Sequence, residues 1–309
     1  MLIDWHAHHT PPEIVEEFAK LTGNAPRIDK YDSLDFAQRI SEMDAARVDI
    51  QLVCQGAGIY ADLFSPNQAM EMVRRSNDLV AERIAPFPDR LLGVIAVSMK
   101  DIEGSVKEIE RMAAKGFRAV LIYPRAGGEV IVDSPEADPL FAKIAELELP
   151  IFLHGAASSK DPSLLRLEDE GAGVIYSVIA DASVSECVVR MIAAGLFDRY
   201  PSLNIVVRSG GGGLPLLLHR LFWKHKGLKG EQRYSDILLD HFLIDTAGVN
   251  VRTLQFLIDT MGEDRIVFGS DYCGGLGPLL KALPVIEEQP VPNHIKSFTE
   301  RNSRRLLHL

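Results

Sequence analysis

The chain has 309 residues, of which 47% are hydrophobic and 25% are charged, and its formal net charge is −10. These proportions are typical of a globular protein, so they exclude a disordered chain and allow a sizeable core. The excess of acidic residues argues against nucleic acid and anionic membranes as partners, because both require clustered cations.

The compartment can also be predicted from the sequence. The three cysteines have no CxxC spacing, which is typical of a reducing environment without a disulfide framework. No apolar run approaches the roughly 18 residues that a membrane span needs, and no signal segment precedes the first apolar run. We therefore expect a cytoplasmic protein that does not enter a membrane.

Short apolar or β-branched runs recur along the chain, and stretches with helical periodicity lie between them. The predicted strands cover residues 2–5, 50–54, 91–97, 117–123, 150–154, 203–208, 240–245 and 265–270. The predicted helices cover residues 33–47, 67–84, 101–115, 138–147, 183–194, 214–223 and 250–261.

This alternation predicts an α/β fold with a parallel sheet. Eight such units in about 300 residues fit a (β/α)8 barrel of the TIM type better than an open sheet. No GxGxxG follows the first strand, so the sequence gives no support to a dinucleotide-binding fold. No Gly/Ser-rich or Pro-rich linker divides the chain, and we expect residues 1–309 to form a single domain.

The first predicted strand ends in two histidines, His6 and His8, two positions apart. Side chains at i and i+2 of a strand point to the same face, so both imidazoles should point into the barrel. Catalytic residues of TIM barrels lie at the carboxyl ends of the strands, which is where this pair falls. Two solvent-facing loop histidines are the alternative interpretation.

A third histidine, His154, ends the predicted fifth strand, and Asp271 follows the eighth. Taken alone, the first would more often be a core residue and the second a turn or cap residue. Together the four supply three imidazole nitrogens and one carboxylate oxygen, which suits Zn²⁺, Mn²⁺ or Fe²⁺. We expect one divalent ion bound by His6, His8, His154 and Asp271, with Zn²⁺ as the first choice.

Five segments at the predicted strand ends resemble those of the amidohydrolase superfamily, and most closely its aminocarboxymuconate-semialdehyde decarboxylase-like group, the amidohydrolase-2 family. They are His6-Ala7-His8, Phe152-Leu153-His154, Gly210-Gly211-Gly212-Gly213-Leu214-Pro215, Ile244-Asp245-Thr246-Ala247-Gly248 and Gly269-Ser270-Asp271-Tyr272. The resemblance implies a barrel with one zinc or manganese ion, often dimeric. It also implies decarboxylation, hydration or hydrolysis of a small molecule.

One position departs from this family. Its members usually carry a proton-handling histidine immediately before the glycine-rich run, and this chain has Ser209 there, preceded by Arg208. A serine hydroxyl is no general base near neutral pH, and losing such a base costs about 10²- to 10⁴-fold in rate. Besides Ser209 itself, the candidates for proton transfer are His9, Glu186 and Asp271.

Further residues are candidates for substrate contacts. Arg125 could bind a substrate carboxylate in bidentate fashion, although a surface loop arginine is equally compatible with its position. Tyr272 and Cys273 directly follow Asp271 and could line the pocket. We expect Arg208 to form a structural ion pair and Asp245 to orient its neighbours without binding the metal.

The resemblance implies one main functional hypothesis, and two alternatives stand beside it. The main hypothesis is a metal-dependent, non-oxidative decarboxylase of a small planar aromatic or unsaturated carboxylic acid, assembled as a homodimer or a higher homo-oligomer. The first alternative is a hydrolase or hydratase that uses a metal-activated water. The second is a non-catalytic metal-binding barrel, which only Ser209 suggests.

Overall fold

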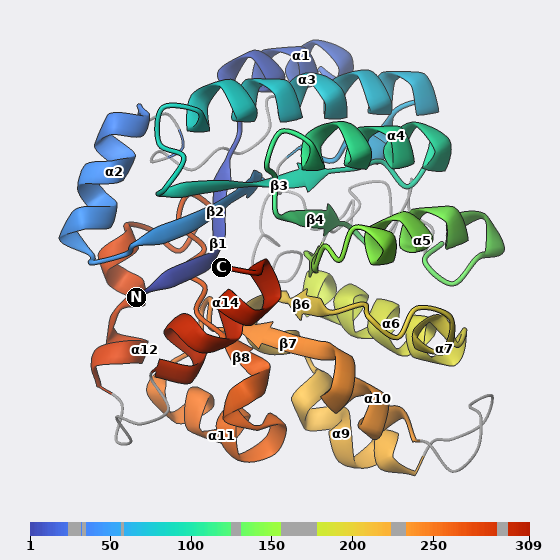
Figure 1. Cartoon of the computed structure of the whole chain (residues 1–309), viewed down its shortest axis with the longest axis vertical. Coiled ribbons are helices and arrows are strands. Elements are labelled where there is room, and N and C mark those ends of the chain that lie inside the picture. Colours follow the sequence, from blue (N-terminus) through green and yellow to red (C-terminus); the bar gives the residue numbers. More distant parts are fainter. Residues whose placement is uncertain are drawn as a thin grey trace.

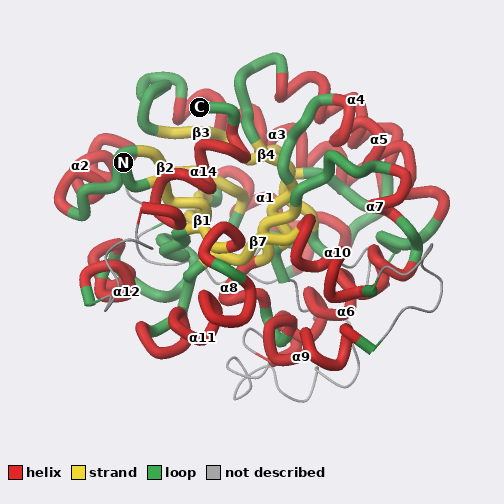
Figure 2. Tube along the Cα trace, turned by 60° about the horizontal axis from the view of Figure 1, so that its bottom comes forward, coloured by secondary structure: helices red, strands yellow, loops and turns green. Residues whose placement is uncertain are grey.

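The structure is a computed structural model of the whole chain, and it describes residues 1–23, 32, 35–56, 59–124, 131–155, 178–223, 233–288 and 296–309. Eight parallel strands form one sheet, in which each strand pairs with the next along the chain. The strands gather in the middle of the molecule, and the helices surround them (Figure 2). This arrangement is the predicted TIM-type barrel.

Each strand overlaps one of the eight predicted runs, and most of them are shorter. They are β1 (Ile3–His9), β2 (Ile50–Gln55), β3 (Leu91–Ala96), β4 (Ala119–Ile122), β5 (Ile151–Leu153), β6 (Ile205–Val207), β7 (Phe242–Asp245) and β8 (Ile266–Val267).

Helices connect successive strands and cover the outside of the barrel (Figure 1). Among the residues that the structure describes, no helix is both long and apolar enough to cross a membrane. The helices are α1 (Pro12–Thr22), α2 (Phe36–Ala45), α3 (Pro66–Ile84), α4 (Ile102–Ala113), α5 (Asp138–Glu146), α6 (Ala180–Ala193), α7 (Leu196–Arg199), α8 (Arg208–Gly211), α9 (Leu214–Phe222), α10 (Tyr234–His241), α11 (Val251–Met261), α12 (Pro284–Glu287) and α14 (Asn302–Leu307).

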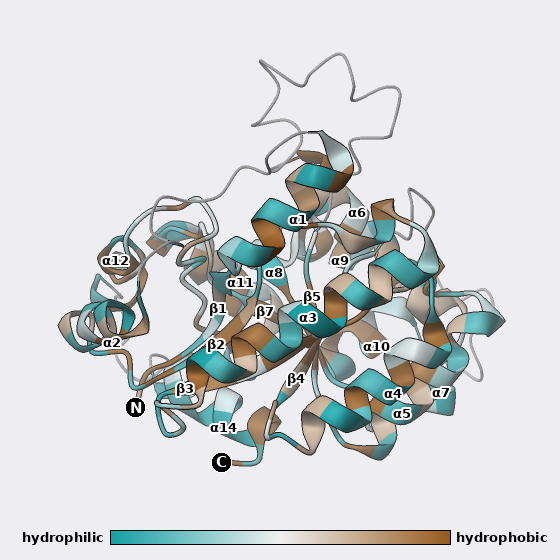
Figure 3. Ribbon diagram, turned by 90° about the horizontal axis from the view of Figure 1, so that it is seen from above, coloured by the Kyte–Doolittle hydropathy of each residue, from teal (hydrophilic) through white to brown (hydrophobic). Residues whose placement is uncertain are grey.

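The segment that follows the last strand bonds to β1 and closes the barrel. The backbone N–H of Trp5 donates to the carbonyl of Phe268 at 2.9 Å, and that of His8 donates to the carbonyl of Tyr272 at 2.8 Å. β8 ends at Val267 and not at residue 270 as predicted, because the N–H of Phe268 donates at 3.0 Å to Phe298 in the helical turn η7 (Ser297–Arg301). The ends of the chain lie on the same side of the molecule (Figure 3).

The core has two layers, one on each face of the strands. Val53, Val120 and Val207 belong to the large outer cluster between the sheet and the helices. Their neighbours Leu52, Leu121 and Val206 belong to a smaller cluster inside the barrel. Because strand side chains alternate between faces, a residue that follows an outer position at a strand end points into the barrel.

A register shift in β1 changes this alternation just before the two histidines. Ile3 and Trp5 belong to the inner cluster, whereas Ala7 belongs to the outer one. The pairing of β1 with β2 shifts between Asp4 and Ala7, as in a β-bulge. The shift leaves His6 and His8 on the inner face, directly beyond Trp5.

Candidate metal centre

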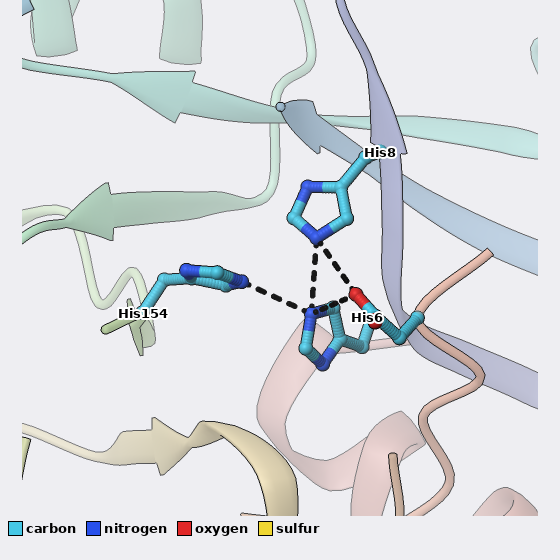
Figure 4. A group of neighbouring side chains, drawn as sticks. His6, His8 and His154 are labelled. Carbon is cyan, nitrogen blue, oxygen red and sulfur yellow. Dashed lines mark hydrogen bonds and ion pairs between the residues drawn. The ribbon is translucent and has the colours of Figure 1, made fainter. Parts of the chain in front are cut away.

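Four side chains from three strand ends meet at one end of the barrel. His6 and His8 come from β1, His154 follows β5 and Asp271 follows β8. One ligand atom from each lies within 4.8 Å of all the others, the three histidines are buried, and the Asp271 side chain is 15% exposed. Figure 4 shows the labelled imidazoles converging on a common point.

The separations between these atoms match those of ligands around one ion. The Nε2 atom of His6 lies 3.1 Å from Nε2 of His8, 3.2 Å from Nε2 of His154 and 3.1 Å from Oδ1 of Asp271. Donors about 2.1 Å from a metal lie about 3.0 Å apart in octahedral and about 3.4 Å apart in tetrahedral coordination. The donor set therefore fits a divalent ion.

The other ring nitrogen of each histidine explains why the Nε2 atoms need a cation. Nδ1 lies 2.7 Å from Oδ2 of Asp245 in His6, 3.2 Å from the carbonyl of Gln55 in His8, and 3.0 Å from the carbonyl of Gly155 in His154. These partners are acceptors, so Nδ1 carries the proton in each neutral ring. The Nε2 lone pairs then face one another, and a metal ion satisfies them.

The local charges also favour a cation. Burial alone lowers the pKa of His6, but the charges of Asp245 and Asp271 outweigh it and raise the pKa to about 9. Burial raises the pKa of Asp271, but His6 and His8 outweigh it and hold the pKa well below its ordinary value. The negative charge that attracts a proton to His6 attracts a metal ion equally.

The backbone around Asp271 is specialised for this arrangement. Asp271 has a positive φ of 55°, which is uncommon for a residue other than glycine. Gly274 passes so close that a Cβ atom there would collide with Oδ1 of Asp271 and would lie 2.5 Å from a ring carbon of His8. A residue with a side chain at this position would displace two of the four ligands.

Asp245, at the end of β7, holds His6 in place. Its Oδ2 is the acceptor for His6 Nδ1, and its Oδ1 accepts the backbone N–H groups of Ser209 at 2.7 Å and Ala247 at 2.9 Å. Both oxygens are therefore used, and the carboxylate is fully buried. Asp245 lies outside the four-residue cluster, and its role in orienting neighbours without binding the metal stays a prediction.

Comparison with known proteins identifies the family of the chain. The family model described as "Amidohydrolase" matches residues 3–308. This chain belongs to that family.

Among the curated relatives, gamma-resorcylate decarboxylase of Rhizobium sp. (strain MTP-10005) is 29% identical over 250 residues, which cover 76% of this chain and 75% of the relative. The structure of 5-carboxyvanillate decarboxylase from Sphingomonas paucimobilis is 25% identical, with a TM-score of 0.87 over 100% of this chain and 99% of the other.

A third similar protein is dihydroxybenzoic acid decarboxylase from Polaromonas sp. JS666, whose structure contains manganese and the inhibitor 2-nitroresorcinol. It is 24% identical, with a TM-score of 0.83 over 100% of this chain and 97% of the other. At this identity the likeness supports the barrel fold alone.

Two of the predicted proton-transfer candidates of this chain have other partners. His9 follows His8 and faces away from the cluster, where its Nδ1 lies 3.0 Å from Oδ1 of Asp32. Glu186 lies on the exposed side of α6 and pairs with Arg190 at 3.6 Å. Of the candidates, the structure brings Asp271 into the cluster and places Ser209 beside it.

Ser209 has a structural connection to the cluster through its backbone. It has φ 52° and ψ 56°, and its N–H donates to Asp245, the partner of His6. Its hydroxyl accepts from Nε of Arg208 at 3.0 Å.

The predicted substrate-contact residues lie in different places. The ring of Tyr272 is buried in the outer core, with the guanidinium of Arg39 5.0 Å from its centroid. Cys273 is buried in the same outer cluster and has a positive φ of 63°. Arg125 lies outside the described residues.

Tyr123 is a residue near the cluster that the sequence analysis did not single out. It follows β4 at an inner position and belongs to the inner cluster. Its ring centroid lies 5.8 Å from that of His154 and 5.6 Å from that of Tyr60. Continuing the alternation of Ala119 and Leu121 by one step beyond the strand would have identified it.

Proposed function

We propose that this chain is a metal-dependent, non-oxidative decarboxylase of a small planar aromatic or unsaturated carboxylic acid. The observation that carries the proposal is the convergence of three imidazole nitrogens and one carboxylate oxygen at the strand ends of the barrel. The relative identified above as gamma-resorcylate decarboxylase supports this choice of reaction within the family.

His6, His8, His154 and Asp271 would hold the ion, which when bound acts as a Lewis acid that binds substrate oxygens. The protein's own contribution begins with orientation. Asp245 fixes the ring of His6, and the carbonyl groups of Gln55 and Gly155 fix His8 and His154. Rigid ligands hold the acid in one plane, so that the carbon bearing the carboxyl group faces the proton carrier.

We assign proton transfer to Asp271. Its Oδ1 is the atom that contacts both His6 and His8, which leaves Oδ2 to take an acidic proton from the substrate. Oδ2 then gives this proton to the carbon that bears the carboxyl group. The carbon–carbon bond breaks, its electron pair returns to the organic fragment, and CO2 leaves.

The experiment that tests the proposal is product analysis with metal-loaded protein. The panel consists of aromatic acids with a hydroxyl group next to the carboxyl group, 2,6-dihydroxybenzoate among them, together with unsaturated dicarboxylic acids. We expect release of one CO2 per turnover from at least one acid. Asp271→Asn should lower the rate by about 10²-fold or more, whereas Asp259→Asn, on the outer helix α11 where it pairs with Gln255, should not.

The other outcomes identify the alternatives. A product heavier by one water would contradict decarboxylation and would support the hydrolase or hydratase hypothesis. Binding of metal and acids without turnover, followed by turnover in Ser209→His, would contradict an intrinsic enzyme and would support the non-catalytic barrel.

The identity of the metal, the oligomeric state and the cellular location are part of the same proposal. We infer that Zn²⁺ or Mn²⁺ occupies the site, since both accept imidazole and carboxylate ligands. Comparing the rates of metal-free protein reloaded with either ion identifies the active metal. We further propose a cytoplasmic homodimer, which sedimentation of the purified chain and fractionation of cells would test.

A further inference from the structure

Arg208 occupies a position from which it can reach the metal centre. Val206 belongs to the inner cluster and Val207 to the outer one. Val207 is extended, with φ −100° and ψ 128°, so the side chain of Arg208, the first residue of α8, points into the barrel. The register pairs Val207 with Leu153 on one side and with Ile244 on the other. The residues that come next on the three neighbouring chain segments are His154, Arg208 and Asp245, which therefore lie side by side at the ends of β5, β6 and β7.

The guanidinium of Arg208 is mostly enclosed, yet it is weakly paired. Its side chain is 14% exposed, and Nε donates to the hydroxyl of Ser209 at 3.0 Å. Among the described residues, the carboxylate oxygen that pairs with it is Oδ1 of Asp181, which lies 3.8 Å from a terminal nitrogen, beyond hydrogen-bond distance. Within the described residues, the terminal nitrogens of Arg208 have no hydrogen-bond partner, so most of its five N–H donors remain available to a ligand.

A second polar group lies near this cation. The hydroxyl of Tyr123 is buried, and no hydrogen-bond partner for it exists in the part of the chain that the structure describes. Both groups flank the same ligand, because the Tyr123 ring lies edge-on against that of His154. Arg208 lies next to this histidine as well, because His154 and Arg208 each come one residue after the paired Leu153 and Val207.

We propose that Arg208 and Tyr123 form an anion-binding subsite beside the metal centre, which holds a second acidic group of the substrate. An arginine fork binds a carboxylate through two parallel hydrogen bonds, and a phenol hydroxyl adds a neutral donor. Ser209 is the positioning residue, because its hydroxyl holds Nε and leaves the terminal nitrogens to the ligand.

The anion at this subsite is not the carboxyl group that departs. During decarboxylation the negative charge of the departing carboxylate moves into the organic fragment. A cation bound to that carboxylate would stabilise the starting state more than the transition state, and this would slow the reaction. Arg208 therefore selects an acid with two anionic groups, of which one is retained. The anion-binding subsite rests on the proposed decarboxylase function only for the statement that the other carboxyl group leaves.

The test compares a two-anion acid with a one-anion acid. Isophthalate and benzoate, bound to the metal-loaded protein and measured by calorimetry, report the selectivity without turnover. In Arg208→Gln we expect isophthalate to bind about 10- to 150-fold more weakly, the range for a hydrogen bond to a charged group. Benzoate should change by less than about threefold. Arg208→Lys should restore part of the difference, because it keeps the charge without the fork.

Two controls separate this role from a structural one. Arg199→Gln removes an arginine that pairs with Asp138 on the outer surface and should leave both affinities unchanged. Metal content measured in every variant shows whether the centre itself is intact. Ser209→Ala should weaken isophthalate binding in the same direction as Arg208→Gln, since it releases Nε.

The outcomes distinguish the two proposals. Equal losses for both acids in Arg208→Gln, with the metal retained, would overturn the subsite. Decarboxylation by wild type with unchanged selectivity in Arg208→Gln would overturn the subsite and leave the proposed function standing. Arg208-dependent preference for isophthalate without release of CO2 from any acid would support the subsite and contradict the decarboxylase.

Discussion

At the scale of single residues, Gly274 is the position where one added methyl group has the largest predicted effect on the metal centre. A Cβ atom there would collide with Oδ1 of Asp271 and press on the ring of His8. We predict that Gly274→Ala binds the metal at least about 10-fold more weakly, as expected when ligand positions are disturbed.

Gly213→Ala is the matched control for this substitution. Gly213 has a φ of −93°, and a Cβ atom there would lie 3.6 Å from Oγ of Ser185, which is an ordinary contact. Titration of both variants with Mn²⁺ or Zn²⁺ gives the comparison. Equal affinities in the two variants would show that the Asp271 position is not required for binding.

The pH dependence of metal binding follows from His6. In the metal-free protein its pKa is raised to about 9, so below that pH an incoming ion must displace a proton. Affinity should therefore rise with pH between 6 and 9, by about tenfold per unit for each displaced proton. Calorimetry in buffers of different ionisation enthalpy measures the protons released, and an affinity independent of pH over this range would contradict the assignment.

The four ligands were predicted from their places near strand ends, but alternation along a strand accounts only for His154, which directly follows β5. His6 and His8 reach the inner face through the register shift in β1, and Asp271 lies four residues beyond the end of β8. The same reasoning did not identify Tyr123. The expected structural ion pair of Arg208 is present, with Asp181 at 3.8 Å. The proximity of Gly274 to its neighbours depends on the path of a loop, and no local pattern in the sequence encodes that path.

At the scale of elements, Asn77 connects a helix to a strand in the interior. From α3, its side chain donates to the carbonyl of Ala96 at 3.0 Å and accepts from the N–H of the same residue at 2.9 Å. It also donates at 2.8 Å to Glu108 of α4, and both side chains are buried. Asn77→Ala would leave several buried polar groups unpaired, so we predict a loss of about 2–4 kcal/mol in the free energy of unfolding.

Urea denaturation measures this loss, and Asn204→Ala provides the comparison. The Asn204 side chain donates to the carbonyl of Ser202 at the surface, so its removal should cost less than about 1 kcal/mol. Similar midpoints for the two variants would show that the bonds between α3, β3 and α4 contribute little.

The strands were predicted more reliably than the helix boundaries, for identifiable reasons. Ser183 resembles a helix cap, but α6 begins at Ala180, and the Ser183 hydroxyl donates to the Ala180 carbonyl inside the first turn. In α2 the cap is Asp35, which accepts from Gln38 at 2.7 Å, and the helix does not begin at residue 33. Side chains that can cap a helix also occur inside it, so spacing alone does not locate the first residue.

At the scale of the whole molecule, the barrel connects the two ends of the chain. The indole N–H of Trp5, in the inner layer, donates to the hydroxyl of Ser303 in α14 at 2.8 Å. Asp4 in β1 likewise accepts the hydroxyl of Ser270 at 2.6 Å, after β8. Since the first and last segments stabilise one another, we expect the chain to unfold as a single domain.

Calorimetric unfolding tests this expectation and its link to the metal. We predict one cooperative transition, whose midpoint rises by about 4 °C when the free metal is at 100 times its Kd, because the bound ion adds about 2.7 kcal/mol. Two separate transitions, of which one responds to metal, would contradict the single-domain description.

The measurement that tests the central claim most directly is the metal content of the purified chain and of a His6→Ala/His8→Ala double variant. Each is stripped with chelator, reloaded with Mn²⁺ or Zn²⁺, desalted and analysed by elemental mass spectrometry. We predict about one equivalent of metal in the wild type and almost none in the double variant, with both chains folded by circular dichroism. Equal metal in both, or none in the wild type, would contradict a metal centre at His6, His8, His154 and Asp271.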